Sequence, residues 1–210
     1  MSTARDDKFF EILTQAKGLF LEYGLRSLSM DDISRKLAIS KKTLYQYVDS
    51  KEDLISKIFE HSQSETQEFY DRVCPKDLNA IDILLEASKF VSKEMLRFNP
   101  VITFDMMKYY PVLFNNFIEM KRDLIHRKIK DNILQGINEG IYRENLNPEL
   151  ISQIYVNNLV SMHQADFLAK SHLTFAMVFE VMFENHIRAI ANRQGLDYFE
   201  SKRDSLDFQL

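Results

Sequence analysis

The segment at residues 40–54, SKKTLYQYVDSKEDL, gathers lysine and tyrosine side chains in a chain whose formal net charge is −4. Residues 35–51 hold five Lys or Arg residues against Asp49 alone, which predicts a basic surface on an otherwise acidic protein. Lysine can donate to O6 and N7 of guanine, and a threonine methyl can pack on the methyl of thymine. Tyr45 and Tyr47 cannot both point to one face of a helix, and a tyrosine hydroxyl can donate to a phosphate oxygen. These residue types predict contact with double-stranded DNA.

A helix-turn-helix arrangement is predicted to position these side chains. Apolar residues recur at three- and four-residue spacings from about 6 to 23, which predicts a helix that ends before Gly24. Ser29 is a predicted N-cap for a second, short helix, and Ser40 for a third helix that continues to about residue 47. Two short helices joined by a three-residue turn are typical of the helix-turn-helix.

The third helix is the predicted recognition helix, whose N-terminal residues face the base edges in the major groove. Those residues are Lys41, Lys42 and Thr43, whereas Leu44 and Val48 form the buried face that holds this helix on the first one. A second interpretation stays open at this point. Lysines on a short surface helix can be a solvated face, and one of the tyrosines can be an ordinary core aromatic.

The block at residues 29–59, SMDDISRKLAISKKTLYQYVDSKEDLISKIF, resembles the DNA-binding segment of the tetracycline-repressor (TetR) family of bacterial transcriptional regulators. It departs from the family pattern at Lys42, where Gly or Pro is common, and at Val48, where Phe is typical. Lys42 therefore leaves the base preference open, but not the docking mode. The resemblance covers about residues 9–59, and its matching positions are Ser40, Thr43, Leu44, Tyr45, Tyr47, Ser50, Lys51, Glu52 and Leu54.

The resemblance implies an all-α homodimer with an N-terminal three-helix helix-turn-helix DNA-binding domain and a C-terminal helical ligand-binding and dimerisation domain. The domains are expected at 1–50, with the fourth helix running on to about residue 60, and at 51–200, before a tail at 201–210. Asp31 is expected to be a helix-start charge, although it can also accept from a cytosine amino group. By position, the implied DNA contacts are Ser29, Lys41, Lys42, Thr43, Tyr45, Tyr47 and Lys51.

The composition independently favours the all-α fold class. Only 5 Gly and 4 Pro occur in 210 residues, which leaves little turn chemistry for a sheet protein. Further helices are predicted near 51–73, 77–97, 101–108, 112–136, 148–170 and 173–194.

Several features predict a cytoplasmic protein. The single cysteine, Cys74, excludes an intrachain disulfide and fits a reducing compartment. The first residues are charged and amphipathic, unlike a signal peptide, and no run of 18 apolar residues is present to span a membrane.

Two apolar stripes near the C-terminus predict a dimer interface. They exceed what one protomer needs on one side, so a four-helix bundle across a two-fold axis is expected, with a purely intrachain core as the alternative. The interface candidates are Ile154, Leu159, Met162, Phe175, Phe179, Met182, Phe183, His186 and Ile190.

A stretch rich in Met, Phe and Tyr at residues 90–120 predicts an adaptable apolar cavity, with an ordinary core as the alternative. Asp105, Lys108 or a tyrosine hydroxyl could orient a ligand there. The pocket candidates are Phe90, Phe104, Met107, Tyr110, Phe114, Phe117 and Tyr155.

No catalytic motif is found. The five histidines are scattered without a metal-ligand spacing, and no phosphate loop, dinucleotide fingerprint or nucleophile elbow occurs. We therefore expect no enzyme activity, no cofactor and no metal. The predicted function is a ligand-responsive repressor that binds a palindromic operator as a homodimer and is released by an unidentified apolar small molecule. The alternatives are an activator, or a small-molecule binding protein or enzyme on a helix-turn-helix scaffold.

Overall fold

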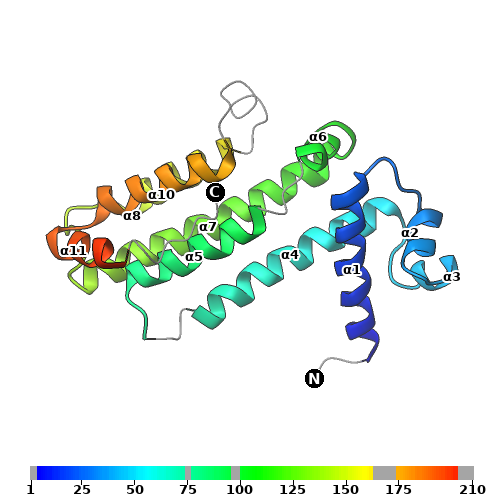
Figure 1. Cartoon of the computed structure of the whole chain (residues 1–210), viewed down its shortest axis with the longest axis horizontal. Coiled ribbons are helices and arrows are strands. Elements are labelled where there is room, and N and C mark those ends of the chain that lie inside the picture. The colour runs from blue at the N-terminus through cyan, green and yellow to red at the C-terminus, as the bar shows by residue number, and fades with distance from the viewer. Residues whose placement is uncertain (1–3, 74–76, 96–99, 163–173, 203–210) are drawn as a thin grey trace. The chain divides into compact units, whose positions relative to one another are not determined.

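The computed structural model describes residues 4–73, 77–95, 100–162 and 174–202, and it confirms the all-α fold class (Figure 1). No strand occurs in these ranges, where Tyr142 and Ala191 form an isolated antiparallel bridge. Among the described helices, none combines the length and the apolar character that a membrane span requires. Cys74 lies outside the described residues.

The described residues form two compact units. Those up to Glu68, together with residues 100–117, make up the first unit. Its helices are α1 (Ala4–Tyr23), α2 (Met30–Lys36), α3 (Lys41–Leu44), most of α4 (Lys51–Val73), α6 (Pro100–Tyr109) and the first turns of α7 (Pro111–Asn138). The first unit therefore contains α6, whereas the domain bounds predicted from the sequence include α6 in the C-terminal domain at 51–200.

Local sequence rules account for the helix ends of the first unit. Gly24 follows α1 with φ +82°, a left-handed conformation that glycine adopts without a steric penalty. Ser29 and Asp32 form a reciprocal capping box at the start of α2, as predicted. Regular α-helix in α3 ends at Leu44, three residues earlier than expected, because the amide of Tyr47 turns back to bond the Leu44 carbonyl at 3.0 Å.

The core of the first unit is formed by the apolar faces of α1, α2, α3, α4 and α6. Its fully buried residues include Ile12, Leu13, Ala16, Phe20, Ile33, Leu44, Val48, Leu54, Ile55 and Met106. Burial of these side chains is the main favourable term that holds the short α2 and α3 in place, since helices of this length are not stable alone.

The second unit contains α5 (Ala80–Met95), the rest of α7, α8 (Pro148–Ser161), α10 (Phe175–Ile190) and α11 (Arg193–Lys202). In this unit α10 packs against α5, α8 and α11. A single helix over 173–194 was predicted, but α10 ends at Ile190 and α11 follows. Asn192 explains the break, because its Oδ1 accepts from Gly195 N at 3.0 Å and its Nδ2 donates to Gly140 O at 2.7 Å.

Candidate nucleic-acid interface and apolar groove

Helix α3, the predicted recognition helix, is fixed from both of its ends. The Ser40 Oγ accepts the amide of Thr43 at 2.9 Å and lies 2.7 Å from the Thr43 hydroxyl. Leu44 and Val48 are buried in the core of the first unit, as predicted. The N-terminal turn of α3 is therefore held rigidly while its outer face stays open to solvent.

That outer face carries Lys41 and Lys42, both exposed. The Lys41 ammonium lies 2.8 Å from Oδ1 of Asp31 in the first turn of α2, and this contact raises the pKa of Lys41 above its ordinary value. Among the residues that the structure describes, none forms a hydrogen bond or ion pair with the Lys42 side chain. Lys42 is thus the cation of this helix that is available to an anionic or hydrogen-bonding partner.

The two tyrosines of this segment have different environments. Tyr45 is 42% exposed, whereas the half-buried ring of Tyr47 stacks on Phe9 of α1 with 5.7 Å between centroids and 4° between planes. The expectation that both rings cannot share one face is confirmed. Removing the whole Tyr47 side chain would disturb the packing of α1, so a phenylalanine substitution is the informative one.

Lys51, at the start of α4, is turned toward its own protein. Its Nζ donates to the Leu28 carbonyl at 2.6 Å, in the loop that precedes α2. Burial lowers the pKa of Lys51, and the carboxylate of Asp105 on α6 opposes that shift. In this structure Lys51 therefore braces the loop before Ser29, the exposed N-cap of α2.

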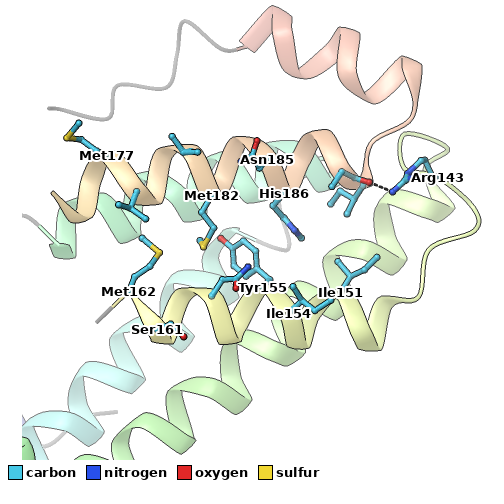
Figure 2. A pocket seen from close by; sticks show the side chains of 15 residues that line it. Arg143, Ile151, Ile154, Tyr155, Ser161, Met162, Met177, Met182, Asn185 and His186 are labelled. Carbon is cyan, nitrogen blue, oxygen red and sulfur yellow. Dashed lines mark hydrogen bonds between the residues drawn. The ribbon is translucent and has the colours of Figure 1, made fainter. Parts of the chain in front are cut away.

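The second unit carries an apolar groove of about 950 Å³ between α8 and α10 (Figure 2). Figure 2 shows Tyr155 and His186 meeting between the two helices, and their rings are 4.4 Å apart between centroids. The residues that line the groove are Arg143, Ile151, Ile154, Tyr155, Asn158, Ser161, Met162, Met177, Val178, Val181, Met182, Asn185, His186, Ala189 and Ile190.

His186 is the polar group with the most unusual environment in this groove. Its Nε2 is buried and has no hydrogen-bond partner within the described part of the chain. Burial lowers the pKa of His186 to about 4, so the imidazole is neutral at pH 7. The unpaired ring nitrogen is a buried polar atom that a hydrogen-bonding group bound in the groove would satisfy.

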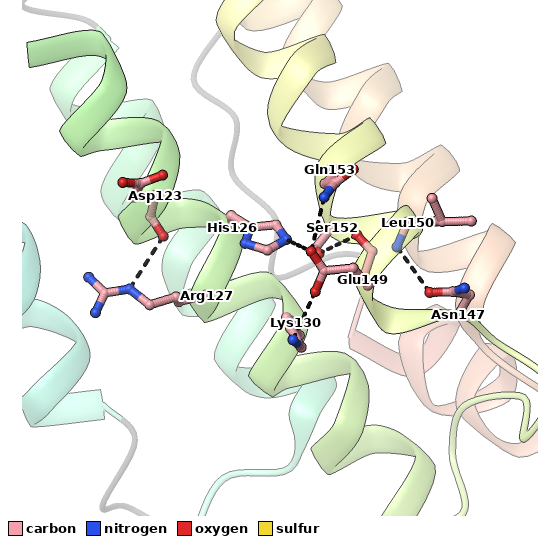
Figure 3. A network of polar contacts seen from close by, with 9 residues as sticks. All are labelled: Asp123, His126, Arg127, Lys130, Asn147, Glu149, Leu150, Ser152 and Gln153. Atoms are coloured by element: carbon pink, nitrogen blue, oxygen red, sulfur yellow. Dashed lines mark hydrogen bonds and ion pairs between the residues drawn. The ribbon is translucent and has the colours of Figure 1, made fainter. Parts of the chain in front are cut away.

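A polar network joins α7 to the start of α8 (Figure 3). Glu149 lies 2.8 Å from the Lys130 ammonium and 3.2 Å from the His126 imidazole, both on α7, and accepts from Gln153 at 2.9 Å. Hydrogen bonding from Lys130 lowers the pKa of Glu149. Glu149 thus ties the start of α8 to α7, while Ile154 of the same helix lines the groove with residues of α10.

Residues 12–58 match the family described as bacterial regulatory proteins, tetR family. The match includes the N-caps Ser29 and Ser40, the whole of α3 and the start of α4. The chain carries the N-terminal domain of the TetR family. No curated protein matches the chain significantly.

Solved structures extend the similarity in fold beyond this TetR domain. A TetR-family transcriptional regulator from Agrobacterium tumefaciens is 17% identical and gives a TM-score of 0.67, over 89% of this chain and 98% of that one. A transcriptional regulator from Cytophaga hutchinsonii is 19% identical, with a TM-score of 0.69 over 89% and 100% of the two chains. A γ-butyrolactone receptor, an ArpA-like protein, is 12% identical, with a TM-score of 0.66 over 97% and 99%. The chain therefore shares the overall fold of these solved structures over 89–97% of its length.

The predicted pocket residues lie in several places. Phe104 and Met107 are exposed on α6, Tyr110 and Phe114 pack on the core of the TetR domain, and Phe117 stacks on Phe59 in the first unit. In the second unit, Phe90 stacks on Phe69, and Tyr155 lines the groove. An effector pocket built from all seven stays a prediction. Asp105 does not face such a pocket, because its carboxylate accepts the amides of Leu25 and Arg26.

The predicted interface residues also separate into two sets. Leu159, Phe179 and Phe183 are buried in the protomer's own core, where they leave no surface for a partner, and Phe175 packs against that core. Ile154, Met182 and His186 line the groove, as do Met162 and Ile190, which are also buried in that core. The sequence missed Val181 and Met177, which are exposed in the groove, and it missed Asp105 as a structural group. Val181 and Met177 are four residues apart, a spacing that could have revealed them.

Proposed function

We propose that this chain is a ligand-responsive transcriptional regulator that binds a palindromic operator as a homodimer. It acts as a repressor and is released by an apolar small molecule. The observation that carries the proposal is the construction of α3, which presents Lys41 and Lys42 to solvent while Leu44 and Val48 are buried behind them. A helix held in this way can enter the major groove with its N-terminal turn.

The proposed DNA contacts fall into two classes. Lys41, Lys42 and Thr43 face base edges, where lysine reads guanine and the threonine methyl packs on thymine. Tyr45 and Tyr47, with Ser29 at the start of α2, contact phosphates and set the register. Lys51 reaches a phosphate only where its ammonium leaves the Leu28 carbonyl that it bonds in this structure. Two copies of this surface, related by a two-fold axis, read half-sites about one helical turn apart, ~34 Å.

The groove between α8 and α10 supports a homodimer. Ile154 and Val181 are 59% and 60% exposed on its two helices, an unusual exposure for branched aliphatic side chains that face each other across one groove. In a two-fold dimer the same surface serves both copies, so α8 and α10 of two chains form a four-helix bundle. Met162, Met177 and Met182 can adapt to that packing because their side chains are flexible.

The effector is proposed to be small and largely apolar. Aromatic and Met side chains on α5, α6 and α7 favour such a ligand. A receptor of similar fold is named for a γ-butyrolactone, a small molecule of this kind. The effector acts by binding more tightly to a conformation that does not fit the operator, which shifts the population away from DNA binding. Repression in the cytoplasm follows if the operator overlaps a promoter.

The deciding experiment selects DNA from a random duplex library with the purified full-length protein. We expect a palindromic site that binds more tightly than a scrambled duplex, with an affinity that falls as salt rises. Lys42→Ala combined with Tyr47→Phe should weaken binding to the selected site by at least about tenfold and relax its sequence preference, while the helical circular dichroism stays unchanged. Recovery of no preferred sequence, or full retention of binding by the double variant, would exclude the proposed recognition surface.

The alternatives give different results in the same experiment. A small-molecule binding protein or enzyme on this scaffold would yield no enriched sequence. An activator would bind its site but raise transcription from an adjacent promoter in a reconstituted assay, whereas a repressor would lower it. Among the described residues, no group of three or more His, Cys, Asp or Glu is placed to hold a metal ion.

A further inference from the structure

Asp105 is a buried carboxylate on α6, in the first unit, and it is 7% exposed. Its Oδ2 accepts the backbone amides of Leu25 at 3.1 Å and Arg26 at 3.3 Å. These are the two residues after Gly24, at the point where the chain leaves α1 and turns toward α2. A buried carboxylate is costly unless hydrogen bonds compensate it, so this pairing fixes the turn and α6 to each other.

A second contact between the same two segments lies one helical turn away. The Arg26 guanidinium donates through Nη1 to the Tyr109 hydroxyl at 2.8 Å, and its Cζ lies 4.5 Å from the centre of the Tyr109 ring. Between these contacts, Met106 is buried in the core of the unit. Helix α6 is therefore joined to the α1–α2 turn by two polar contacts, one buried at Asp105 and one more exposed at Tyr109. The buried Met106 lies between them in sequence.

The turn that Asp105 holds leads directly to the DNA-facing elements. The Leu28 carbonyl accepts from Lys51 at the start of α4, and Ser29, the next residue, is the N-cap of α2. The first turn of α2 carries Asp31, which pairs with Lys41 of α3. These polar contacts, linked by short backbone segments, connect α6 to α3 through the α1–α2 turn and α2.

Charge supports the same connection. Lys51 is partly buried, which lowers its pKa, and the Asp105 carboxylate is the group that favours its charged form. Loss of that carboxylate would leave the ammonium in a less favourable site beside the loop that it braces.

We propose that Asp105 is a positioning residue for DNA binding: its carboxylate holds the α1–α2 turn, and through it α2 and α3, in the arrangement that fits the operator. Asp105 touches no DNA. The proposal rests on the proposed function, and it assigns to α6 a specific side chain that sets operator affinity.

The test compares three variants of the full-length protein on the selected operator duplex and on a scrambled duplex. Asp105→Leu removes the acceptor of both amides and should weaken operator binding by at least about tenfold. Asp105→Asn keeps one oxygen that both amides can share, so it should restore most of the affinity, to within about threefold of the wild type. Binding to the scrambled duplex should change little, because the phosphate contacts remain.

Asp82→Leu is the matched control. Asp82 lies on α5 in the second unit, where its Oδ2 accepts the Tyr198 hydroxyl at 2.7 Å. This change removes the same charge and also breaks a hydrogen bond, but it should leave the ratio of operator to scrambled-duplex affinity unchanged. Amide exchange at Leu25 and Arg26 should accelerate in Asp105→Leu but not in Asp82→Leu.

Three outcomes decide the proposal. A folded Asp105→Leu variant with wild-type operator affinity would overturn it, even if its melting temperature fell. If Asp105→Leu does not fold, Asp105→Ala, which also removes the acceptor of both amides, takes its place, and wild-type operator affinity in that variant would equally overturn the proposal. If the wild-type protein selects no operator, the proposed function itself fails. The wild-type measurement shows that result before any Asp105 variant is compared.

Discussion

The ammonium of Lys41 lies 2.8 Å from Oδ1 of Asp31, so the first residue of the recognition helix is ion-paired with the first turn of α2. Both side chains are more than half exposed, at 55% and 58%. The pair orients α3 on α2, but it also engages a cation that we assign to DNA. On operator binding, the Lys41 ammonium must therefore either leave Asp31 for an acceptor on a base or phosphate, or contact the DNA while Asp31 stays beside it.

Asp31→Asn should strengthen DNA binding several-fold, because it releases Lys41 and removes a negative charge beside the duplex. The rise should be greatest at low salt, where electrostatic attraction is least screened. Fluorescence anisotropy on operator and scrambled duplexes at two salt concentrations measures both effects. Asp197→Asn, which breaks an exposed pair with Arg193 in the second unit, is the control for net charge. Weaker and less selective binding by Asp31→Asn would indicate instead that Asp31 accepts from a cytosine.

Lys42→Ala should reduce operator affinity by about tenfold or more and relax the preference at one base pair, as expected for a lysine that reads guanine. If Lys42 contacts only a phosphate, binding should weaken equally on all sequences and the salt slope should fall by about one. A repeated selection with the variant distinguishes the two. Lys89→Ala on α5, an exposed lysine that pairs with Glu86, should leave DNA binding unchanged.

Ile154→Glu should convert the proposed dimer into a monomer, since it places a charge in the groove between α8 and α10. Leu150→Glu is a closely matched control one turn away on α8, because Leu150 is 55% exposed against 59% for Ile154 but does not line the groove. Sedimentation equilibrium should therefore find a monomer for the first variant and a dimer for the second. A dimer in both would place the interface elsewhere.

Local rules made much of the first unit predictable. Ser29 and Ser40 are capping residues at a spacing that fixes where α2 and α3 begin, and Gly24 marks the end of α1. Leu44 and Val48 were predicted as the buried face of α3 from their spacing alone, and the structure buries both. These signals act within about four residues, so one sequence is enough to recognise them.

Long-range relationships could not be predicted in the same way. Asp105 accepts from Leu25, a residue 80 positions away, and nothing in the sequence near either residue indicates that pairing. Periodicity likewise shows that α10 has an apolar face but not what covers it. Phe179 and Phe183 pack inside the protomer, whereas Val181, between them in sequence, is exposed in the groove. Only the three-dimensional arrangement separates the core stripe from the exposed one.

Stability should depend on His186 at mildly acidic pH. Burial lowers the pKa of His186 in the folded protein from 6.5 to about 4, so between these values the unfolded chain binds the proton and the folded chain does not. The free energy of unfolding should therefore fall as pH decreases from 6.5 to 4, by up to about 3 kcal/mol from this residue. Below pH 4 both states are protonated, and this contribution levels off.

His186→Leu should remove that part of the pH dependence, which urea unfolding at fixed protein concentration between pH 4.5 and 7 can measure. Acidic residues contribute to the slope in both proteins, so the difference between wild type and variant isolates His186. His61→Gln changes a histidine of the first unit and retains His186. This variant should show the same pH dependence of the free energy of unfolding as the wild type. Parallel stability curves for wild type and His186→Leu would show that the imidazole is hydrated or paired in solution.

Two glycines in helices should respond oppositely to alanine. A Cβ added at Gly136 of α7 would lie 2.1 Å from the Tyr142 ring, which is buried and donates its hydroxyl to Asn132 at 3.1 Å. Neither the ring nor its hydrogen bond can shift without disturbing the core, so Gly136→Ala should destabilise the protein by about 3 kcal/mol. At Gly18 of α1 nothing lies within 4 Å, and Gly18→Ala should stabilise it by about 0.5–1 kcal/mol through helix propensity. Urea unfolding followed by circular dichroism measures both, and a tolerated Gly136→Ala would mean that Tyr142 has a second rotamer available.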